Sequence, residues 1–148
     1  MKIEKASVED NEILTEITKK SKAYWGYSEE QILKWKDNLT ISKGYIENNS
    51  VFKLVKSERT IGYYSYCIKE KNVILDNLFL LPEYIGKGLG KYLMDDFLNR
   101  MRNEKFEKIT LDSEPNAENF YFKIGFKKIG EFETSIKNRF MPIMEMSL

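Results

Sequence analysis

Three glycines at alternate positions are the feature that most constrains how this chain folds. Gly86, Gly88 and Gly90 follow an apolar, strand-like run that ends at Pro82, and a helical pattern begins directly after them. Glycine at alternate positions removes side chains where backbone N–H groups must approach another group closely. These donors lie at the N-terminus of a helix, where unpaired N–H groups and the helix dipole favour an anion. The segment therefore predicts a strand, a pyrophosphate-binding turn and a helix; a turn of purely structural kind usually needs only one glycine.

The helix after the glycines is amphipathic. Apolar side chains recur at every fourth position, at Leu89, Leu93, Phe97 and Met101, and polar residues fill most of the other side. This spacing is typical of a helix that packs on a sheet.

The rest of the pattern predicts the order of the elements. Capping boxes at Ser7 and Ser28 begin two helices, and a short helix over residues 117–123 ends at Gly125. Alternating apolar runs separated by polar turns predict the strands. These strands cover residues 2–6, 51–55, 61–68, 73–80, 109–112, 126–134 and 140–146. At 148 residues the chain is expected to form one domain.

Three phosphate-binding motifs compete for the glycines. A Walker A loop requires G-x-x-x-x-G-K-[ST], but Gly86 and Gly90 are one residue too close together and Tyr92 follows Lys91. A dinucleotide-binding fingerprint requires G-x-G-x-x-G and a later acidic residue. The spacing here is G-x-G-x-G, although Asp112 lies at a suitable distance. The third motif is the coenzyme A pyrophosphate loop, [QR]-x-x-G-x-[GA], of the GNAT superfamily of N-acetyltransferases.

Two stretches of the chain resemble this superfamily. Residues 78–90 are similar to its coenzyme A loop, with Ile85 where the family usually has Gln or Arg. Residues 112–126 are similar to its strand, short Tyr-bearing helix and Gly-Phe strand start. The resemblance implies an α/β (α+β) fold, in which a mixed, mostly antiparallel central sheet of six to seven strands carries about four helices on its two faces. It also implies a single GNAT-like domain over residues 1–148 that uses acetyl-CoA (coenzyme A).

The resemblance implies a coenzyme-binding role for the glycine turn, the strand end before it and one residue of the short helix. In the family the pantetheine arm lies along that strand end, and the backbone N–H near Leu80 donates to the thioester oxygen. Lys87 and Lys91 would supply the charge that Ile85 lacks. The implied coenzyme-binding residues are Leu78, Phe79, Leu80, Ile85, Gly86, Lys87, Gly88, Leu89, Gly90, Lys91 and Asn119.

The resemblance also implies catalytic groups. The family's matching tyrosine, here Tyr121, protonates the leaving thiolate; the alternative is a packed aromatic residue like Phe120 and Phe122. Asp76 and Glu114 lie near the ends of the two strands that flank the expected cleft, so either carboxylate is a candidate general base acting through water. A solvated or helix-capping role is the alternative for both.

The acceptor is expected to meet aromatic side chains and one arginine. Tyr24, Trp25 and Tyr27 form an aromatic loop between the first two helices, and such side chains suit the alkyl part or the cation of an amine. Arg139 in the last hairpin is a candidate clamp for an anionic acceptor group; the alternative is a surface arginine at a turn.

The missing residue types restrict the chemistry. The chain has no histidine and one cysteine, Cys67, which excludes a Ser-His or Cys-His nucleophile and leaves too few ligands for a zinc site. No metal is therefore expected, and Cys67 is expected in the core. A net charge of +1 without a Lys/Arg block argues against a nucleic-acid partner. No run of about 18 apolar residues predicts a membrane span, and the start lacks the apolar core of a secretory signal, so we expect a cytoplasmic location.

These features predict an acetyltransferase. It would move an acetyl group from acetyl-CoA to a primary amine of a small molecule or peptide by direct attack. The alternative is a non-catalytic acyl-CoA-binding or nucleotide-sensing module with the same fold, which the departure at Ile85 favours. No nucleic-acid or membrane partner is expected, and a homodimer is possible.

Overall fold

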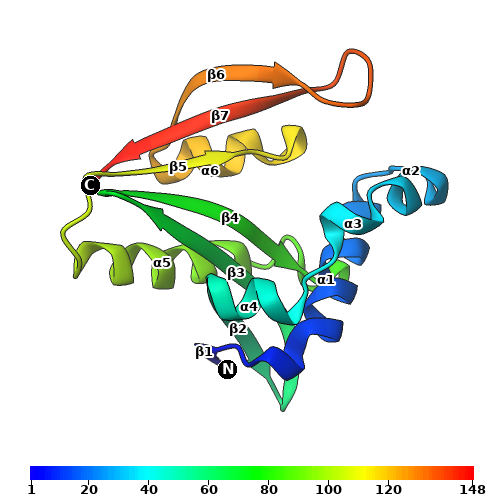
Figure 1. The fold of residues 1–148 in the computed structure, drawn as a ribbon, viewed down its shortest axis with the longest axis horizontal. Coiled ribbons are helices and arrows are strands. Elements are labelled where there is room, and N and C mark those ends of the chain that lie inside the picture. The colour runs from blue at the N-terminus through cyan, green and yellow to red at the C-terminus, as the bar shows by residue number, and fades with distance from the viewer. The chain divides into compact units, whose positions relative to one another are not determined.

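Seven strands form one mixed sheet in the computed structural model, which describes residues 1–148 (Figure 1). The strand order is β1-β2-β3-β4-β5-β7-β6. β4 and β5 are parallel, whereas β2 is antiparallel to β1 and β3, and β7 is antiparallel to β5 and β6. The strands are β1 (Lys2–Lys5), β2 (Ser50–Lys56), β3 (Arg59–Lys69), β4 (Asn72–Leu80), β5 (Lys108–Asp112), β6 (Lys127–Glu133) and β7 (Phe140–Ser147).

Six α-helices accompany the sheet: α1 (Asn11–Tyr24), α2 (Glu29–Lys34), α3 (Lys36–Leu39), α4 (Lys43–Asn48), α5 (Leu89–Arg102) and α6 (Glu118–Ile124). The expected mixed, mostly antiparallel fold is confirmed. The sequence pattern identified about four helices and missed α3 and α4, which have four and six residues. Helices this short do not complete an amphipathic repeat. None of the helices combines the length and the apolar character that crossing a bilayer requires.

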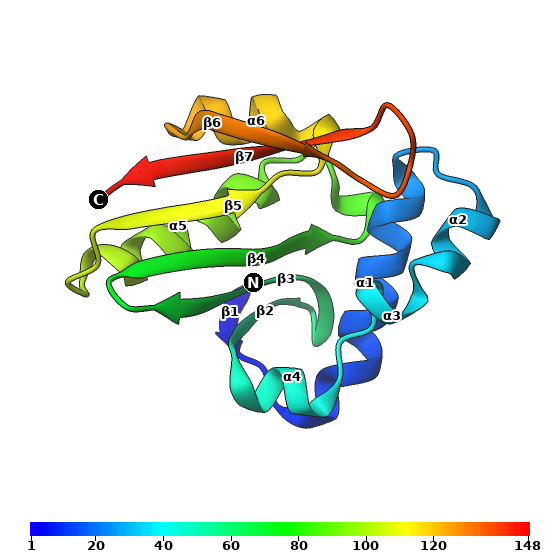
Figure 2. The same cartoon turned by 45° about the horizontal axis from the view of Figure 1, so that its top comes forward.

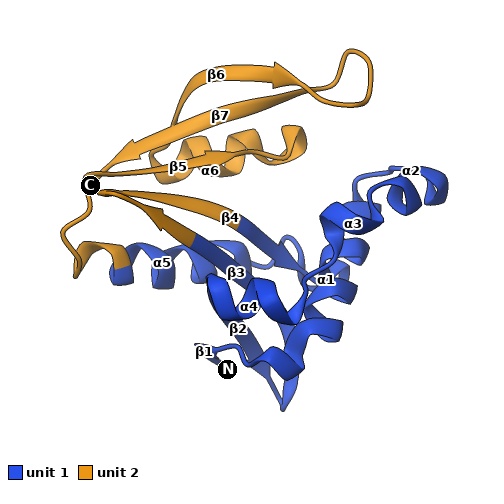
Figure 3. Ribbon diagram, viewed as in Figure 1, with its two compact units in different colours: residues 1–66, 77–100 blue, residues 67–76, 101–148 orange.

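Contacts divide the chain into two compact units, which are described separately (Figure 3). Unit 1 contains residues 1–66 and 77–100, and unit 2 contains residues 67–76 and 101–148. The strands β3 and β4 and the helix α5 contribute residues to both units.

Helices cover both faces of the strands in unit 1. Consecutive residues of a strand point to opposite faces. In β3, Tyr64 and Tyr66 contact Phe97 of α5, with ring centroids 5.5 and 5.4 Å apart, whereas Tyr63 forms a hydrogen bond with Thr18 of α1. α5 therefore packs on one face of β3 and α1 on the other.

Local signals fix the helix starts in unit 1. Ser28 Oγ accepts a hydrogen bond of 3.0 Å from the N–H of Gln31, as its capping box predicted. The carboxylate of Asp10 accepts a 2.8 Å bond from the N–H of Ser7, just before α1. These contacts satisfy N–H groups that have no acceptor within the helix.

Unit 2 combines β5, β7 and β6 with α6 (Figure 2). Its fully buried side chains include Ile109, Phe126 and Met144. Gly125 adopts a φ of +124° and its N–H donates to the carbonyls of Tyr121 and Phe122, at 3.3 and 3.1 Å. Glycine is the residue that best tolerates this conformation, so the predicted end of the short helix is confirmed.

Candidate active site

The glycine turn begins with a short 3-10 helix at Pro82–Tyr84 and enters α5 at Leu89. Gly86 and Gly88 have φ values of +83° and +82°. This left-handed region is unfavourable for residues that carry a Cβ. The backbone itself therefore explains the glycine at these two positions.

The space beside the turn is open in unit 1. A Cβ added to Gly86 or Gly88 would meet no atom within 4 Å. The N–H of Tyr92 donates to the carbonyl of Gly88 at 3.1 Å and begins the hydrogen-bond ladder of α5. The N–H groups that precede it at the helix N-terminus have no acceptor in the ladder. This is the geometry that an anion such as pyrophosphate requires.

Two lysines meet beside the turn. Lys87 Nζ lies 5.9 Å from the centroid of the Tyr84 ring, and Lys56 Nζ lies 5.6 Å from the same centroid. Lys91, in contrast, forms an exposed 2.9 Å ion pair with Asp95. The sequence gave no signal for Lys56, because only the pairing of β2 and β3 brings the end of β2 to this turn.

The end of β4 is tightly packed in unit 1. Leu80 is buried, and the Phe79 ring lies 6.0 Å from the Tyr63 ring and 5.9 Å from Lys22 Nζ. A Cβ on Gly62 of β3 would lie 2.6 Å from Leu80 Cδ2 and 2.8 Å from the Phe79 carbonyl oxygen. Gly62, which the sequence did not identify, therefore allows β3 to pack closely on this strand end.

A polar cluster precedes the strand end. The Asn77 amide donates to Ser65 Oγ at 2.9 Å and to the Tyr45 hydroxyl at 3.1 Å, and these two hydroxyls are 2.8 Å apart. Ser65 is fully buried. A buried network with satisfied partners holds its elements in one arrangement, so this cluster fixes β4 relative to β3 and α4.

Tyr121 is almost fully buried in unit 2. Its ring makes edge contacts with Phe120 and Phe126, at centroid distances of 5.1 and 5.8 Å. Burial raises the pKa of the Tyr121 phenol above its usual range, because the ionised form would lose its hydration. No protein group forms a hydrogen bond with its hydroxyl. At neutral pH this residue is a protonated donor.

Glu114 and Arg139 form a largely buried ion pair in unit 2. Arg139 Nη2 lies 2.8 Å from Glu114 Oε2, and the side chains are 11% and 8% exposed. The Asn116 amide donates to the other carboxylate oxygen at 2.8 Å. The sequence indicated Glu114 and Arg139 for separate roles, and the structure joins them. Their roles in proton transfer and acceptor binding stay predictions.

Asp76 is exposed on β4, and its charge acts on two neighbours within unit 2. Burial and the Asp76 charge raise the pKa of Asp112. The same two causes raise the pKa of the Cys67 thiol, so Cys67 stays protonated. Cys67 is partly exposed, although the sequence predicted it in the core. On α6, Asn119 is exposed.

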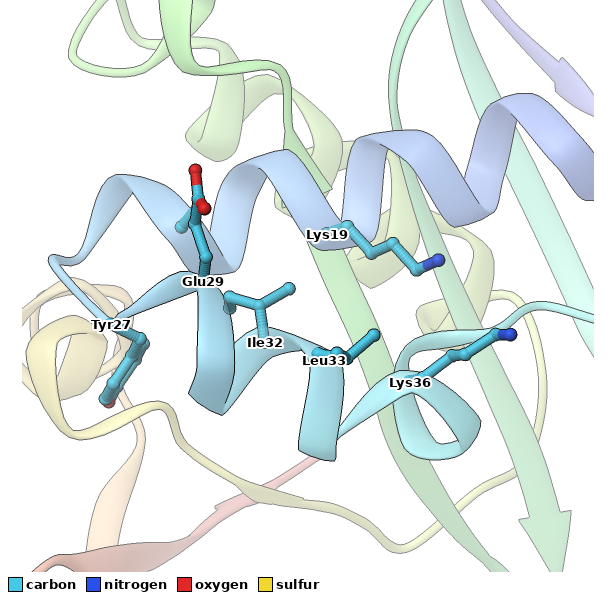
Figure 4. A pocket seen from close by; sticks show the side chains of 7 residues that line it. Lys19, Tyr27, Glu29, Ile32, Leu33 and Lys36 are labelled. Carbon is cyan, nitrogen blue, oxygen red and sulfur yellow. The ribbon is translucent and has the colours of Figure 1, made fainter.

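The aromatic loop borders a pocket in unit 1 (Figure 4). Tyr24 is 51% exposed and its ring packs edge-on against Trp25, whereas the Tyr27 ring packs against Trp35. Tyr27 lines a pocket of about 270 Å³ between α1 and α2–α3. The other lining residues are Lys19, Ala23, Glu29, Ile32, Leu33 and Lys36. The aromatic residues signalled the pocket, but its lysines gave no distinct pattern.

Comparison with known proteins places the chain in a family. A model described as the acetyltransferase (GNAT) domain matches residues 23–148. An uncharacterised N-acetyltransferase, Ycf52 of Gracilaria tenuistipitata var. liui, is 36% identical over 55 residues. That match covers 37% of this chain and 30% of Ycf52; its counterpart in Porphyra purpurea is 35% identical over 38% of this chain and 33% of that protein. The matched segment thus spans about a third of these curated relatives.

Solved structures agree with this assignment. The crystal structure of the PaiA N-acetyltransferase from Thermoplasma acidophilum, in complex with coenzyme A, matches with a TM-score of 0.82 at 26% identity, over 100% of both chains. A GCN5-related N-acetyltransferase from Rhodopseudomonas palustris has the same fold, with a TM-score of 0.80 at 21% identity over 99% of this chain and 95% of that one. The chain therefore belongs to the GNAT family of acetyltransferases.

Proposed function

We propose that this protein transfers the acetyl group of acetyl-CoA to a primary amine of a small molecule or peptide. The observation that carries the proposal is the glycine turn, with its left-handed Gly86 and Gly88, its open space and the N-terminus of α5. The coenzyme A bound to the similar PaiA structure supports the choice of ligand.

The residues around the turn fit a pyrophosphate. Backbone N–H groups between Gly86 and Lys91 donate to its oxygens, as at other helix N-termini that bind phosphate. Lys56 and Lys87 add positive charge beside the Tyr84 ring. Acetyl-CoA supplies the acetyl group as a thioester. The backbone N–H near Leu80 donates to the thioester oxygen and stabilises the negative charge that develops there.

Tyr121 serves as the general acid. The amine nitrogen bonds to the carbonyl carbon, the carbon–sulfur bond breaks, and Tyr121 gives its proton to the leaving sulfur. Its raised pKa keeps that proton available at neutral pH. A general acid accelerates such a step by about 10²–10⁴-fold.

Asp76 is the better candidate for the general base. Its carboxylate is exposed, so water can carry a proton from the amine to it. Both carboxylate oxygens of Glu114 already accept hydrogen bonds, from Asn116 and Arg139. Glu114 therefore positions the turn before β7, and Tyr24, Trp25 and Tyr27 contact the apolar part of the acceptor.

The test is release of free thiol from acetyl-CoA across a panel of small amines and peptide N-termini. Activity on an amine should fall by about 10²–10⁴-fold in Tyr121→Phe, with coenzyme A binding retained. Tyr66→Phe is a matched control, because Tyr66 has the same 8% exposure and belongs to unit 1. An equal loss in both variants would contradict the acid role of Tyr121.

The second candidate is a non-catalytic acyl-CoA-binding module, which Ile85 in the turn favours. It predicts that acetyl-CoA binds but that no amine in the panel accelerates thiol release. Failure to bind coenzyme A at all would contradict both functions.

A further inference from the structure

β6 is a terminal strand of the sheet and pairs only with β7 (Figures 1 and 2). Six of its seven residues are exposed. Two of them are large and apolar: Ile129 is 57% exposed and Phe132 is 40% exposed. A β-bulge between Lys128 and Gly130 leaves Ile129 out of the regular pairing with β7. An exposed strand edge with apolar residues is a template for pairing with another strand.

The other terminal strand is protected in the usual way. β1 has four residues, three of which are the charged Lys2, Glu4 and Lys5. Short length and charge are the devices that prevent strand edges from pairing. β6 is longer and carries Ile129 and Phe132, so the two terminal strands differ in kind.

The charges of β6 are divided between its two halves. Lys127 and Lys128 occupy the first half, and Glu131 and Glu133 occupy the second. A strand that pairs antiparallel with a copy of itself brings its first half opposite the second half of the copy. The basic half would therefore face the acidic half twice, once on each side of the two-fold axis.

We propose that β6 is the interface of a homodimer, in which it pairs antiparallel with β6 of a second copy. Counted residue by residue around Gly130, Lys127 lies opposite Glu133 and Lys128 lies opposite Phe132. A pairing centred on Lys128 or on Glu131 would place like charges opposite each other, which is destabilising. The arrangement tolerates a shift at the bulge, because both lysines lie at one end and both glutamates at the other.

The monomer leaves the outer charges available for this pairing. Lys128 already forms a 2.9 Å ion pair with Glu131 of its own strand. Lys127 and Glu133 have no ion pair within the chain and are exposed. Phe140, which lies opposite Glu133 on β7 and is 41% exposed, extends the apolar strip. A single strand pairing is a small interface, and small interfaces belong to weak, reversible complexes.

The test is sedimentation velocity from low to several hundred micromolar protein. We expect a concentration-dependent change from monomer to dimer. Lys127→Glu and Glu133→Lys should each raise the dissociation constant by about tenfold or more, because each places like charges opposite each other twice. The double variant should restore the dimer, because it exchanges the charges and keeps them complementary.

Lys5→Glu on β1 is the control and should leave the dimer unchanged, because it alters an exposed lysine of the other terminal strand. The melting temperature of every variant should match the wild type, since the changed side chains are exposed. A protein that stays monomeric at all concentrations would overturn the proposal. So would a dimer that Lys127→Glu leaves intact, or one that the double variant does not recover.

Discussion

Replacing Gly88 by alanine separates the strain of the turn from its role in binding. Gly88 has a φ of +82°, and a Cβ there would meet no atom within 4 Å. The substitution therefore causes no clash in the free protein. It does force a residue with a Cβ into the left-handed region, which costs about 1–2 kcal/mol.

Gly26 provides a control with nearly the same backbone. Its φ is +89° and a Cβ there would also meet nothing within 4 Å. Both Gly26→Ala and Gly88→Ala should lower stability by about 1–2 kcal/mol. For a chain of this size, each kcal/mol lowers the melting temperature by about 2–4 °C. The two free variants should therefore melt at similar temperatures.

Coenzyme A should distinguish the two variants. A ligand that hydrogen-bonds to the N–H groups of the turn must occupy the open space that the new Cβ of Gly88→Ala fills. Loss of one charge-assisted hydrogen bond costs about 1.5–3 kcal/mol, so affinity should fall by about tenfold to a hundredfold. Gly26→Ala should keep the wild-type affinity. Calorimetric titration measures both constants, and equal affinities for the two variants would refute the assignment of the turn.

Three further outcomes follow from the site. Because burial raises the pKa of Tyr121, the alkaline limb of the rate profile should lie above the ordinary tyrosine value of about 10, where an exposed acid would already be deprotonated. Lys56→Met should weaken coenzyme A binding by about tenfold in a calorimetric titration, whereas Lys20→Met, on α1, should leave it unchanged. Arg139→Met should lower the free energy of unfolding in urea by about 3–5 kcal/mol, because it leaves the Glu114 carboxylate buried without its partner; adding Glu114→Met should recover most of that loss.

The elements that the sequence predicted are those with strong local signals. The serine at 28 caps its helix as its spacing indicated, and Gly125 ends α6 through its own backbone conformation. The four-residue repeat beginning at Leu89 predicted α5 to within its observed bounds. Such signals lie within a few residues of the structure that they specify. α3 and α4 were missed because helices of four and six residues contain too little of the repeat.

The parts of the site that the sequence did not predict depend on contacts between distant residues. Lys56 and Lys87 meet at Tyr84 only because β2 and β3 pair. The ion pair between Glu114 and Arg139 joins segments on either side of α6 and β6. Each residue was recognised by its chemical type, but the type of a side chain does not indicate its partner. Pairing across the fold is therefore the information that the structure adds.

The departure at Ile85 bears on whether the turn can still bind a phosphate. Backbone N–H groups supply most of the donors at a helix N-terminus, and a side chain at this position adds charge rather than geometry. Unit 1 provides that charge from Lys56 and Lys87, whose ammonium groups lie 5.6 and 5.9 Å from the Tyr84 ring. Isoleucine at 85 removes one donor side chain and leaves the left-handed glycines and the open space intact. The turn thus keeps the features on which anion binding depends, which favours an active acetyltransferase over a module that has lost its coenzyme.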